Sequence, residues 1–112
     1  MIAIGTDIAK VSRFSNLSRK VEDGIFTSLE IEEAGKRLKR GEYLSSRFAA
    51  KEAYVKALGT GFRGIKPKDI EVREEESGAP YLVVRGERKE NVQLSLSHDG
   101  DYSVAFVLIE NE

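Results

Sequence analysis

Three segments of the chain carry the hydrophobic patterns of strands. In residues 2–8 (IAIGTDI), isoleucines occupy three even positions, whereas the odd positions are small or acidic, which predicts a strand with two unlike faces. Residues 92–98 (VQLSLSH) alternate in the same way and predict a half-buried strand. Residues 102–110 (YSVAFVLIE) are almost continuously apolar, which predicts a strand buried on both faces.

Capping residues and good helix formers predict two longer helices. Thr27 and Glu30 have the spacing of a capping box, so we expect a helix that runs to about Arg40 and ends at Gly41. Residues 42–59 contain mainly good helix formers and end at a glycine, which predicts the strongest helix of the chain.

Short elements and turns fill the rest of the chain. Residues 69–76 and 80–84, separated by Ser-Gly-Ala, predict a hairpin. Glycines and a proline predict a loop at 59–67, and single turns are expected at 11–14 and 87–91. This order of elements predicts an α+β fold in which a small, mostly antiparallel sheet packs on a long central helix.

Composition limits the classes of protein to which the chain can belong. With 112 residues, of which 40% are hydrophobic and 33% charged, residues 1–112 are expected to form one globular domain. The lack of cysteine excludes thiol catalysis, and a single histidine excludes a multi-histidine metal site. A net charge of -1 argues against nucleic-acid binding. Without a long apolar run or a leader-like N-terminus, we expect no membrane span and a cytoplasmic location.

The long predicted helix carries a charged pair between two packing stripes. At 100° per residue, Glu52 and Lys56 fall between a bulky apolar stripe and an alanine stripe. The solvated arc is then assigned to Arg47, Lys51 and Tyr54. The pair is either an ordinary i,i+4 ion pair on the surface or lines a cleft, where a partner or a metal must compensate its charge. Its place between the stripes favours the cleft.

Asp7 lies on the face of the first strand that otherwise carries only Ala3 and Gly5. Such a small face lets another backbone approach closely, and the alanine stripe beside Glu52 is the natural partner. Asp7 and Glu52 would then converge, and two carboxylates without a cation repel each other. Mg²⁺, which is often held by one or two carboxylates together with substrate phosphates, would remove that conflict. The alternative is that Asp7 caps the following turn.

Two further segments are candidates for contacts with phosphate. His98 lies on the core side at the end of its strand, and it is either a hydrogen-bonded structural histidine or a phosphate contact and proton shuttle. Gly59 and Gly61 follow the long helix directly, and glycine N–H groups can approach a phosphate closely. A helix C-cap followed by a turn explains these glycines equally well.

Two basic clusters are candidates for docking an acidic partner or a phosphate. One lies at the end of the helix predicted from Thr27 and comprises Lys36, Arg37, Lys39 and Arg40. The other lies early in the chain and comprises Arg13, Arg19 and Lys20. The alternative for both clusters is an ordinary solvated face, since cations near a helix C-terminus are favourable in themselves.

Several motifs together resemble one enzyme family over essentially the whole chain. Residues 5–8 (GTDI) followed by Arg13 are similar to the opening GxDIxxxxR of the bacterial holo-[acyl-carrier-protein] synthases. Residues 47–53 (RFAAKEA) and 56–61 (KALGTG) resemble the central motif of that family. Shorter segments resemble the remaining family motifs, at 69–72, 78–81 and 95–98.

The resemblance implies an activity and a set of catalytic residues. The family transfers 4′-phosphopantetheine from coenzyme A to a serine of apo acyl carrier protein, with Mg²⁺, and releases adenosine 3′,5′-bisphosphate. By resemblance, Asp7 and Glu52 match the metal ligands. Lys56 matches a lysine near the diphosphate, and His98 matches a histidine near the phosphates.

The resemblance also implies partners and an assembly. Arg47, Gly59 and Gly61 match positions that serve coenzyme A, and Arg13 and Lys20 match positions that contact the acidic carrier protein. Arg47 lies about 140° from Glu52 around the helix, so it is expected to serve coenzyme A elsewhere or at an interface. Bacterial members of the family are trimers with active sites between subunits, which implies a homotrimer.

Two other functions stay open from the sequence. The chain could be a non-catalytic member of the same fold that binds a carrier protein or coenzyme A, although all matched catalytic positions are filled. It could also be a small nucleic-acid-binding domain that uses the two basic clusters. The net charge and the lack of interleaved aromatic and basic residues argue against nucleic acid.

Overall fold

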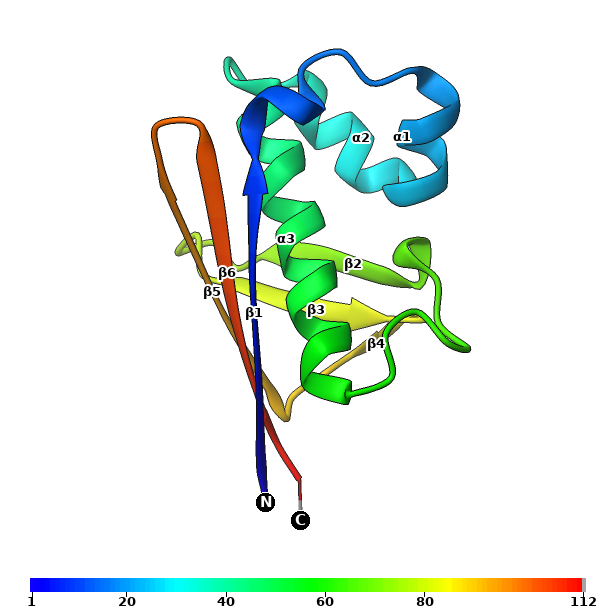
Figure 1. Cartoon of the computed structure of the whole chain (residues 1–112), viewed down its shortest axis with the longest axis vertical. Helices are drawn as coiled ribbons and strands as arrows, with labels where there is room; N and C mark the ends of the chain where they lie inside the picture. The colour runs from blue at the N-terminus through cyan, green and yellow to red at the C-terminus, as the bar shows by residue number, and fades with distance from the viewer. Residues whose placement is uncertain (112) are drawn as a thin grey trace.

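A computed structural model describes residues 1–111, in which one long helix packs on a three-stranded sheet and contacts a second sheet (Figure 1). The strand orders are β1-β6-β5 and β2-β3-β4, and all pairs are antiparallel. The helices are α1 (Arg19–Ile25), α2 (Ser28–Gly35) and α3 (Arg40–Leu58), with 3₁₀ turns at Val11–Phe14 and Pro67–Asp69. The strands are β1 (Ile2–Lys10), β2 (Ile70–Glu74), β3 (Pro80–Val84), β4 (Glu87–Arg88), β5 (Val92–Asp99) and β6 (Tyr102–Glu110).

The predicted α+β class and the central helix are confirmed. Figure 1 shows α3 running along the β1-β6-β5 sheet, with α1 and α2 at one end and the hairpin of β2 and β3 beside its other half. The predicted hairpin and the last two strands are present. The turn expected at 87–91 contains the two-residue strand β4. Within residues 1–111, no helix combines the length and the apolar character needed to cross a bilayer.

The small face of β1 packs tightly against the alanine stripe of α3. A Cβ atom on Gly5 would lie 2.0 Å from the carbonyl oxygen of Ala53 and 2.7 Å from the backbone nitrogen of Ala57. Only glycine therefore fits at this position. The predicted contact between the two small faces is confirmed, and it fixes the distance between β1 and α3.

α3 ends as predicted, but its solvent-facing side does not lie where the helical wheel placed it. Gly59 ends the helix in the left-handed conformation, with φ 78°, where glycine is favoured. The assignment of Arg47, Lys51 and Tyr54 to solvent is wrong, because all three are buried. The wheel assumed that α3 packs on one side only, whereas β1 and β6 cover one side and α2 and β2 contact it elsewhere.

The segment between β1 and α3 forms two short helices instead of the single helix predicted from Thr27. The capping box of Thr27 and Glu30 is present, but α2 already ends at Gly35. Gly41 is not a C-cap and lies in the first turn of α3. A Cβ atom there would lie 3.3 Å from the Val11 carbonyl oxygen, so this glycine serves the close packing of α3 on the preceding turn.

The basic cluster at 36–40 and helix α1 also differ from what the sequence predicts. Lys36 to Lys39 form the link between α2 and α3, and Arg40 is the first residue of α3. The cluster therefore does not occupy the last turn of a helix. Helix α1 was not predicted, although Ser18 caps it by accepting a hydrogen bond from the Val21 backbone nitrogen.

One face of the β1-β6-β5 sheet is exposed in the single chain. Buried and exposed residues alternate along β6, so the prediction that this strand is buried on both faces is wrong for one chain. Phe106 on β6 is 41% exposed, and Ile4 and Ile8 on β1 are 59% and 62% exposed. These side chains belong to the face of the sheet opposite α3. A contiguous apolar face of this kind marks an interaction surface.

Candidate active site

Asp7, Glu52 and Lys56 lie together where β1 meets α3. The Lys56 Nζ atom donates to Asp7 Oδ1 at 2.9 Å and to the Thr6 carbonyl oxygen at 3.0 Å. The Asp7 side chain is 14% exposed and that of Lys56 is 53% exposed. The cluster therefore lies at the edge of the fold, where a ligand can reach it.

Glu52 is half-buried and feels the charge of Asp7. Burial raises the pKa of Glu52, the negative charge of Asp7 raises it further, and Lys56 opposes the rise. The proximity has a simple cause in the sequence. Asp7 lies two residues after Gly5, and Glu52 directly precedes Ala53, the residue against which Gly5 packs. The structure thus brings together the two carboxylates that were expected to converge.

The cluster suits a divalent cation whose coordination shell is completed by a substrate. No group of three or more His, Asp and Glu side chains within residues 1–111 is arranged to hold a metal by itself. Mg²⁺ commonly binds one or two carboxylates together with phosphate oxygens and water, and Asp7 and Glu52 can supply those carboxylates. A cation would also relieve the repulsion that contributes to the raised pKa of Glu52.

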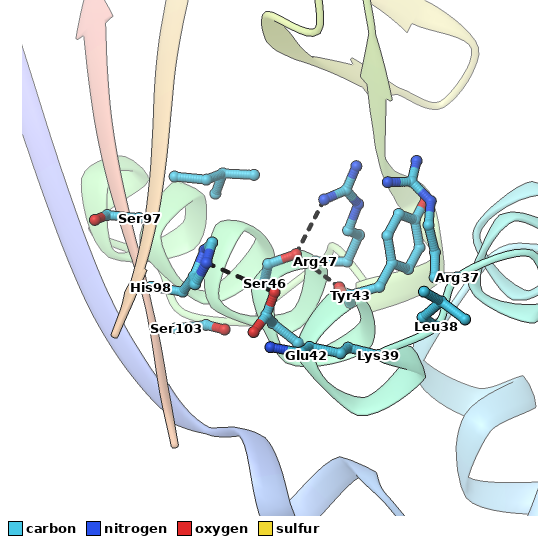
Figure 2. A pocket seen from close by; sticks show the side chains of 11 residues that line it. Arg37, Leu38, Lys39, Glu42, Tyr43, Ser46, Arg47, Ser97, His98 and Ser103 are labelled. Atoms are coloured by element: carbon cyan, nitrogen blue, oxygen red, sulfur yellow. Dashed lines mark hydrogen bonds and ion pairs between the residues drawn. The ribbon is translucent and has the colours of Figure 1, made fainter. Parts of the chain in front are cut away.

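Arg47 and His98 form a second group with different neighbours (Figure 2). Both line a cavity of about 390 Å³ between the first half of α3 and the end of β5. Other residues of its wall are Arg37, Lys39, Glu42, Tyr43, Ser46 and Ser97. The His98 Nε2 atom lies 3.7 Å from Glu42 Oε1, and its side chain is mostly exposed. None of the residues of the carboxylate cluster lines this cavity, so one chain keeps His98 apart from the other predicted catalytic residues.

Arg47 is held in the cavity wall with part of its hydrogen-bonding capacity unused. Its Nη2 atom donates to Glu74 Oε1 at 2.8 Å, and its Nη1 atom donates to Ser46 Oγ at 3.0 Å. Its Nε atom is buried without a hydrogen-bond partner among residues 1–111. Buried donors nearly always have a partner, so the Arg47 side chain is not fully satisfied by the contacts of one chain.

The sequence did not single out Tyr43, which lines this cavity, or Glu74, which does not line it but holds Arg47. The guanidinium groups of Arg47 and Arg37 lie 3.9 Å and 4.7 Å from the centroid of the Tyr43 ring. Arg37 Nη2 also donates to Glu74 Oε1 at 3.2 Å. The i,i+4 spacing of Tyr43 and Arg47 is a local signal that could have found Tyr43. Glu74 lies on β2, so no local spacing connects it to α3.

The remaining predicted contacts lie on exposed segments. Gly59 and Gly61 have positive φ angles of 78° and 59°. They lie in the loop after α3, which begins three residues after Lys56. Arg13 lies in the 3₁₀ turn after β1, and Lys20 lies in α1. All four positions are exposed and are accessible to a partner.

The fold and these two groups define an α+β protein with a carboxylate pair suited to a divalent cation and a separate basic cavity. Residues 3–107 match the family described as the 4′-phosphopantetheinyl transferase superfamily. A holo-[acyl-carrier-protein] synthase of Wolbachia sp. subsp. Drosophila simulans (strain wRi) is 45% identical over 113 residues, which cover 95% of each chain. A holo-[acyl-carrier-protein] synthase of Geobacillus kaustophilus (strain HTA426) is 43% identical over 98% of this chain and 89% of its own length. The chain therefore belongs to the 4′-phosphopantetheinyl transferase superfamily, which confirms the resemblance seen in its motifs.

Solved structures agree with this assignment. A holo-(acyl-carrier-protein) synthase from Bacillus anthracis str. Ames, in complex with CoA (3′,5′-ADP), superimposes with a TM-score of 0.87 at 36% identity, covering 98% of this chain and 96% of that one. The holo-[acyl-carrier-protein] synthase from Neisseria meningitidis gives a TM-score of 0.87 at 33% identity, covering 99% of this chain and all of the other. The whole described fold is thus that of the family.

Proposed function

We propose that the chain transfers the 4′-phosphopantetheine of coenzyme A to a serine of an apo acyl carrier protein, with Mg²⁺, and releases adenosine 3′,5′-bisphosphate. The observation that carries the proposal is the meeting of Asp7, Glu52 and Lys56 at the contact between β1 and α3. The names of the relatives and the complex of the Bacillus anthracis synthase with CoA (3′,5′-ADP) support the two substrates. In this role the protein would serve fatty acid biosynthesis in the cytoplasm.

The chemistry explains why this cluster contains two carboxylates and one positively charged lysine. The serine hydroxyl gives its proton to a base, for which Glu52, His98 and water are the candidates, and its oxygen attacks the β-phosphate of coenzyme A. A new P–O bond forms, and the bond to the nucleotide phosphate breaks, so that adenosine 3′,5′-bisphosphate leaves. Negative charge builds up on the phosphoryl and leaving-group oxygens, so catalysis depends on positioning and on positive charge. When bound, Mg²⁺ supplies such charge at the diphosphate. Asp7 and Glu52 would hold the cation from two elements that Gly5 packs together, and Lys56 can turn from Asp7 to a phosphate oxygen as a second positive charge.

We further propose that the cavity lined by Arg47 and His98 binds a phosphate of coenzyme A. Arg47 lines this cavity with one of its donors unpartnered, and Arg37 and Lys39 add positive charge. Guanidinium groups are well suited to phosphate because they present several donors in one plane. The turn at Gly59 and Gly61 would contact the pantetheine phosphate beside Lys56.

The separation of the two groups supports a homotrimer with active sites between subunits. The exposed apolar face of β1 and β6, which includes Ile4, Ile8 and Phe106, provides a surface through which copies can pack. A neighbouring copy would then bring its Arg47 and His98 to the carboxylate cluster of the first. This arrangement would also explain why β6 is apolar on both faces, because the face that is exposed in a single chain would be covered by a neighbouring copy.

Arg13 and Lys20 are the proposed contacts with the carrier protein. Both side chains are exposed, and both come from the segment between β1 and α2. Exposed cations of this kind attract an acidic partner over several ångströms and raise the rate of encounter. Arg13→Ala is expected to raise the KM for the carrier protein more than the KM for coenzyme A.

Mass spectrometry of the carrier protein tests the proposed activity. The chain is incubated with apo acyl carrier protein, coenzyme A and Mg²⁺, with a chelator in a parallel sample. We expect the carrier protein to gain one phosphopantetheine group, and the chelator to prevent that gain. A carrier protein that stays unmodified with Mg²⁺ present contradicts the proposed reaction.

Mixing two inactive variants tests the site between subunits. Glu52→Gln and His98→Ala are refolded together, so that mixed assemblies contain some sites with both wild-type residues. We expect activity to return on mixing, because each variant supplies the residue that the other lacks. If all site residues came from one chain, the mixture would stay inactive.

A further inference from the structure

Within helix α1, which carries Lys20, apolar contact with the core is limited to Ile25, while Leu17 and Phe26 pack against the core on either side of the helix. It has seven residues, of which Glu22 is the only buried one in the described structure, while Val21 is 44% exposed. A helix this short is not stable by itself. Apolar packing therefore holds the two ends of α1, and we expect polar contacts with its neighbours to fix its orientation between them.

The first anchor of α1 is an ion pair with the start of α3. The Arg40 Nη1 and Nη2 atoms donate to the two carboxylate oxygens of Glu22, each at 2.6 Å. Paired hydrogen bonds between a guanidinium and a carboxylate fix orientation as well as distance. This contact fixes α1 against the N-terminal end of α3.

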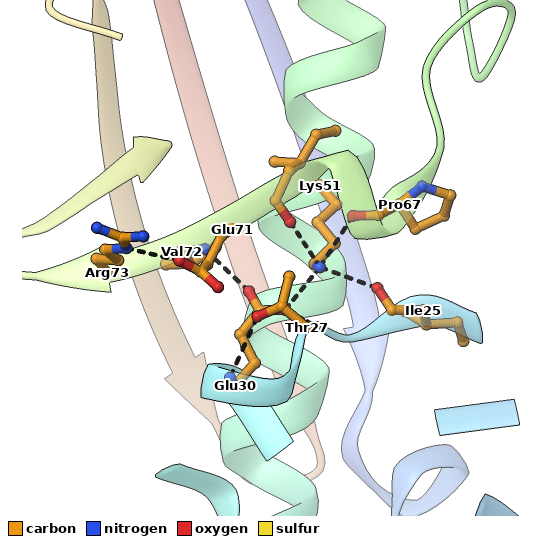
Figure 3. Close-up of polar contacts among 9 residues, drawn as sticks. Ile25, Thr27, Glu30, Lys51, Pro67, Glu71, Val72 and Arg73 are labelled. Carbon is orange, nitrogen blue, oxygen red and sulfur yellow. Dashed lines mark hydrogen bonds and ion pairs between the residues drawn. The ribbon is translucent and has the colours of Figure 1, made fainter. Parts of the chain in front are cut away.

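The second anchor is the ammonium group of Lys51, which is completely buried (Figure 3). Its Nζ atom lies 2.9 Å from the carbonyl oxygen of Ile25 at the end of α1, and 2.7 Å from Glu30 Oε1 on α2. It also lies 3.0 Å and 2.7 Å from the carbonyl oxygens of Pro67 and Ile70. One buried cation thus joins four segments of the chain.

Glu30 extends this anchor in both directions along the chain. Its carboxylate accepts hydrogen bonds from the backbone nitrogens of Thr27 and Val72, both at 2.9 Å. Lys51 precedes Glu52 directly, so the same turn of α3 holds the end of α1 and presents a carboxylate to the active site. A shift of α1 is therefore transmitted to Glu52 through one hydrogen bond and the neighbouring residue Lys51.

We propose that Arg40 and Lys51 are positioning residues, which fix α1 relative to Glu52 so that the docked carrier protein presents its serine at the right distance. Neither residue lies in the carboxylate cluster, and neither lines the cavity with Arg47 and His98. The inference rests on the proposed function, because it assigns the carrier protein to the surface of α1. It adds two residues that act on the carrier protein without touching it.

Arg40→Gln tests the first anchor, since Arg40 is partly exposed and its loss leaves the core in place. We expect the KM for the carrier protein to rise about tenfold, with the KM for coenzyme A changed less than about twofold. Arg73→Gln is the control, because it removes an Arg–Glu contact of the same length, 2.6 Å, that lies on the exposed surface of β2, and it should leave both constants unchanged. An Arg40→Gln variant with a wild-type KM for the carrier protein overturns the proposal.

Charge reversal separates positioning from a general loss of stability. Arg40→Glu alone places two carboxylates together, whereas the double variant Glu22→Arg and Arg40→Glu restores an ion pair with opposite polarity. We expect the double variant to recover most of the KM for the carrier protein that the single variant loses. Equal KM values for the single and the double variant would contradict a positioning role for this pair.

The second anchor is tested with both charges removed, because Lys51 alone cannot be lost without leaving a buried carboxylate unpaired. The double variant Lys51→Met and Glu30→Gln is assayed where circular dichroism shows it to be folded. We expect its KM for the carrier protein to stay raised, since the contact with Ile25 is gone; a wild-type value in the folded variant refutes the role. A wild-type protein without any transfer activity would refute the proposed function instead, so the two failures are distinct.

Discussion

Two lysines of α3 form ion pairs with carboxylates of other elements, one pair buried in the core and the other at the edge of the fold. Lys51 and Glu30 are completely buried, with side-chain exposures of 0% on both sides and an Nζ–Oε1 distance of 2.7 Å. Lys56 and Asp7 lie at the edge of the fold with a similar distance of 2.9 Å. The two pairs have the same chemistry and nearly the same geometry, so burial and surroundings decide what each can do.

The surroundings give the two pairs different functions. Lys51 has four oxygen acceptors within reach, so its charge is fully used by the fold and no ligand can enter. Lys56 has two acceptors and faces solvent, and its partner Asp7 is close to a second carboxylate, Glu52. The exposed pair can rearrange around a cation and a diphosphate, whereas the buried pair cannot.

The largest expected effect comes from Glu52→Gln. We expect transfer to fall by about a thousandfold or more, because loss of one of the two proposed metal ligands would remove several kcal/mol of charge stabilisation in the transition state. Thermal stability should not fall, since the substitution removes the repulsion between Glu52 and Asp7. Glu32→Gln on the exposed side of α2 is the control. A Glu52→Gln variant with wild-type activity would contradict the role of the carboxylate cluster.

Lys51→Met is expected to affect stability above all. Loss of one partner leaves Glu30 buried and unpaired, which typically costs about 3–5 kcal/mol of unfolding free energy. Urea unfolding followed by circular dichroism measures this loss. If the variant unfolds at the same urea concentration as the wild type, the buried pair does not stabilise the fold in the way the geometry indicates.

Lys56→Met should show the reverse pattern. Its exposed ion pair contributes at most about 1 kcal/mol to stability, whereas loss of a positive charge beside the diphosphate is expected to lower kcat about a hundredfold. The same urea titration and the mass-spectrometric assay check both values. Equal losses of stability in Lys51→Met and Lys56→Met would remove the distinction between the two pairs.

The smallest expected effect is a shift in the pH dependence of activity. Glu52 must be ionised to hold a cation, and its pKa is raised by burial and by Asp7 but lowered by Lys56. Activity is therefore lost as the pH falls through this raised pKa. In Lys56→Met the opposing charge is gone, so the acidic limb of kcat/KM against pH should move to higher pH. A limb that stays in place, or moves to lower pH, would assign it to another group.

Much of the fold could be predicted because its signals are local or repetitive. The small face of β1 and the alanine stripe of α3 are visible in the sequence, and their contact predicts that Asp7 and Glu52 converge. The burial of Lys51 could not be predicted from a helical wheel. Its partner Glu30 and its carbonyl acceptors belong to segments far away in the sequence, and only the packing of those segments decides which side of α3 is covered.

The two separate groups of the site show a second limit of sequence reasoning. The motifs name Asp7, Glu52, Lys56 and His98 together, but one chain places His98 in a cavity that the other three do not line. Strand alternation predicts which face a side chain takes, but it does not tell which chain completes a site. The sequence likewise predicts both faces of β6 to be buried, because apolar residues give the same pattern whether they lie in a core or on an exposed face.

Titration of the protein with Mn²⁺ in the presence of coenzyme A, with free Mn²⁺ followed by electron paramagnetic resonance, tests most directly the proposal that the carboxylate cluster binds a divalent cation. We predict a single bound ion per chain in the wild type and in Glu32→Gln, and loss of that binding in both Asp7→Asn and Glu52→Gln. Undiminished Mn²⁺ binding in the two carboxylate variants would contradict the assignment of Asp7 and Glu52 as the ligands.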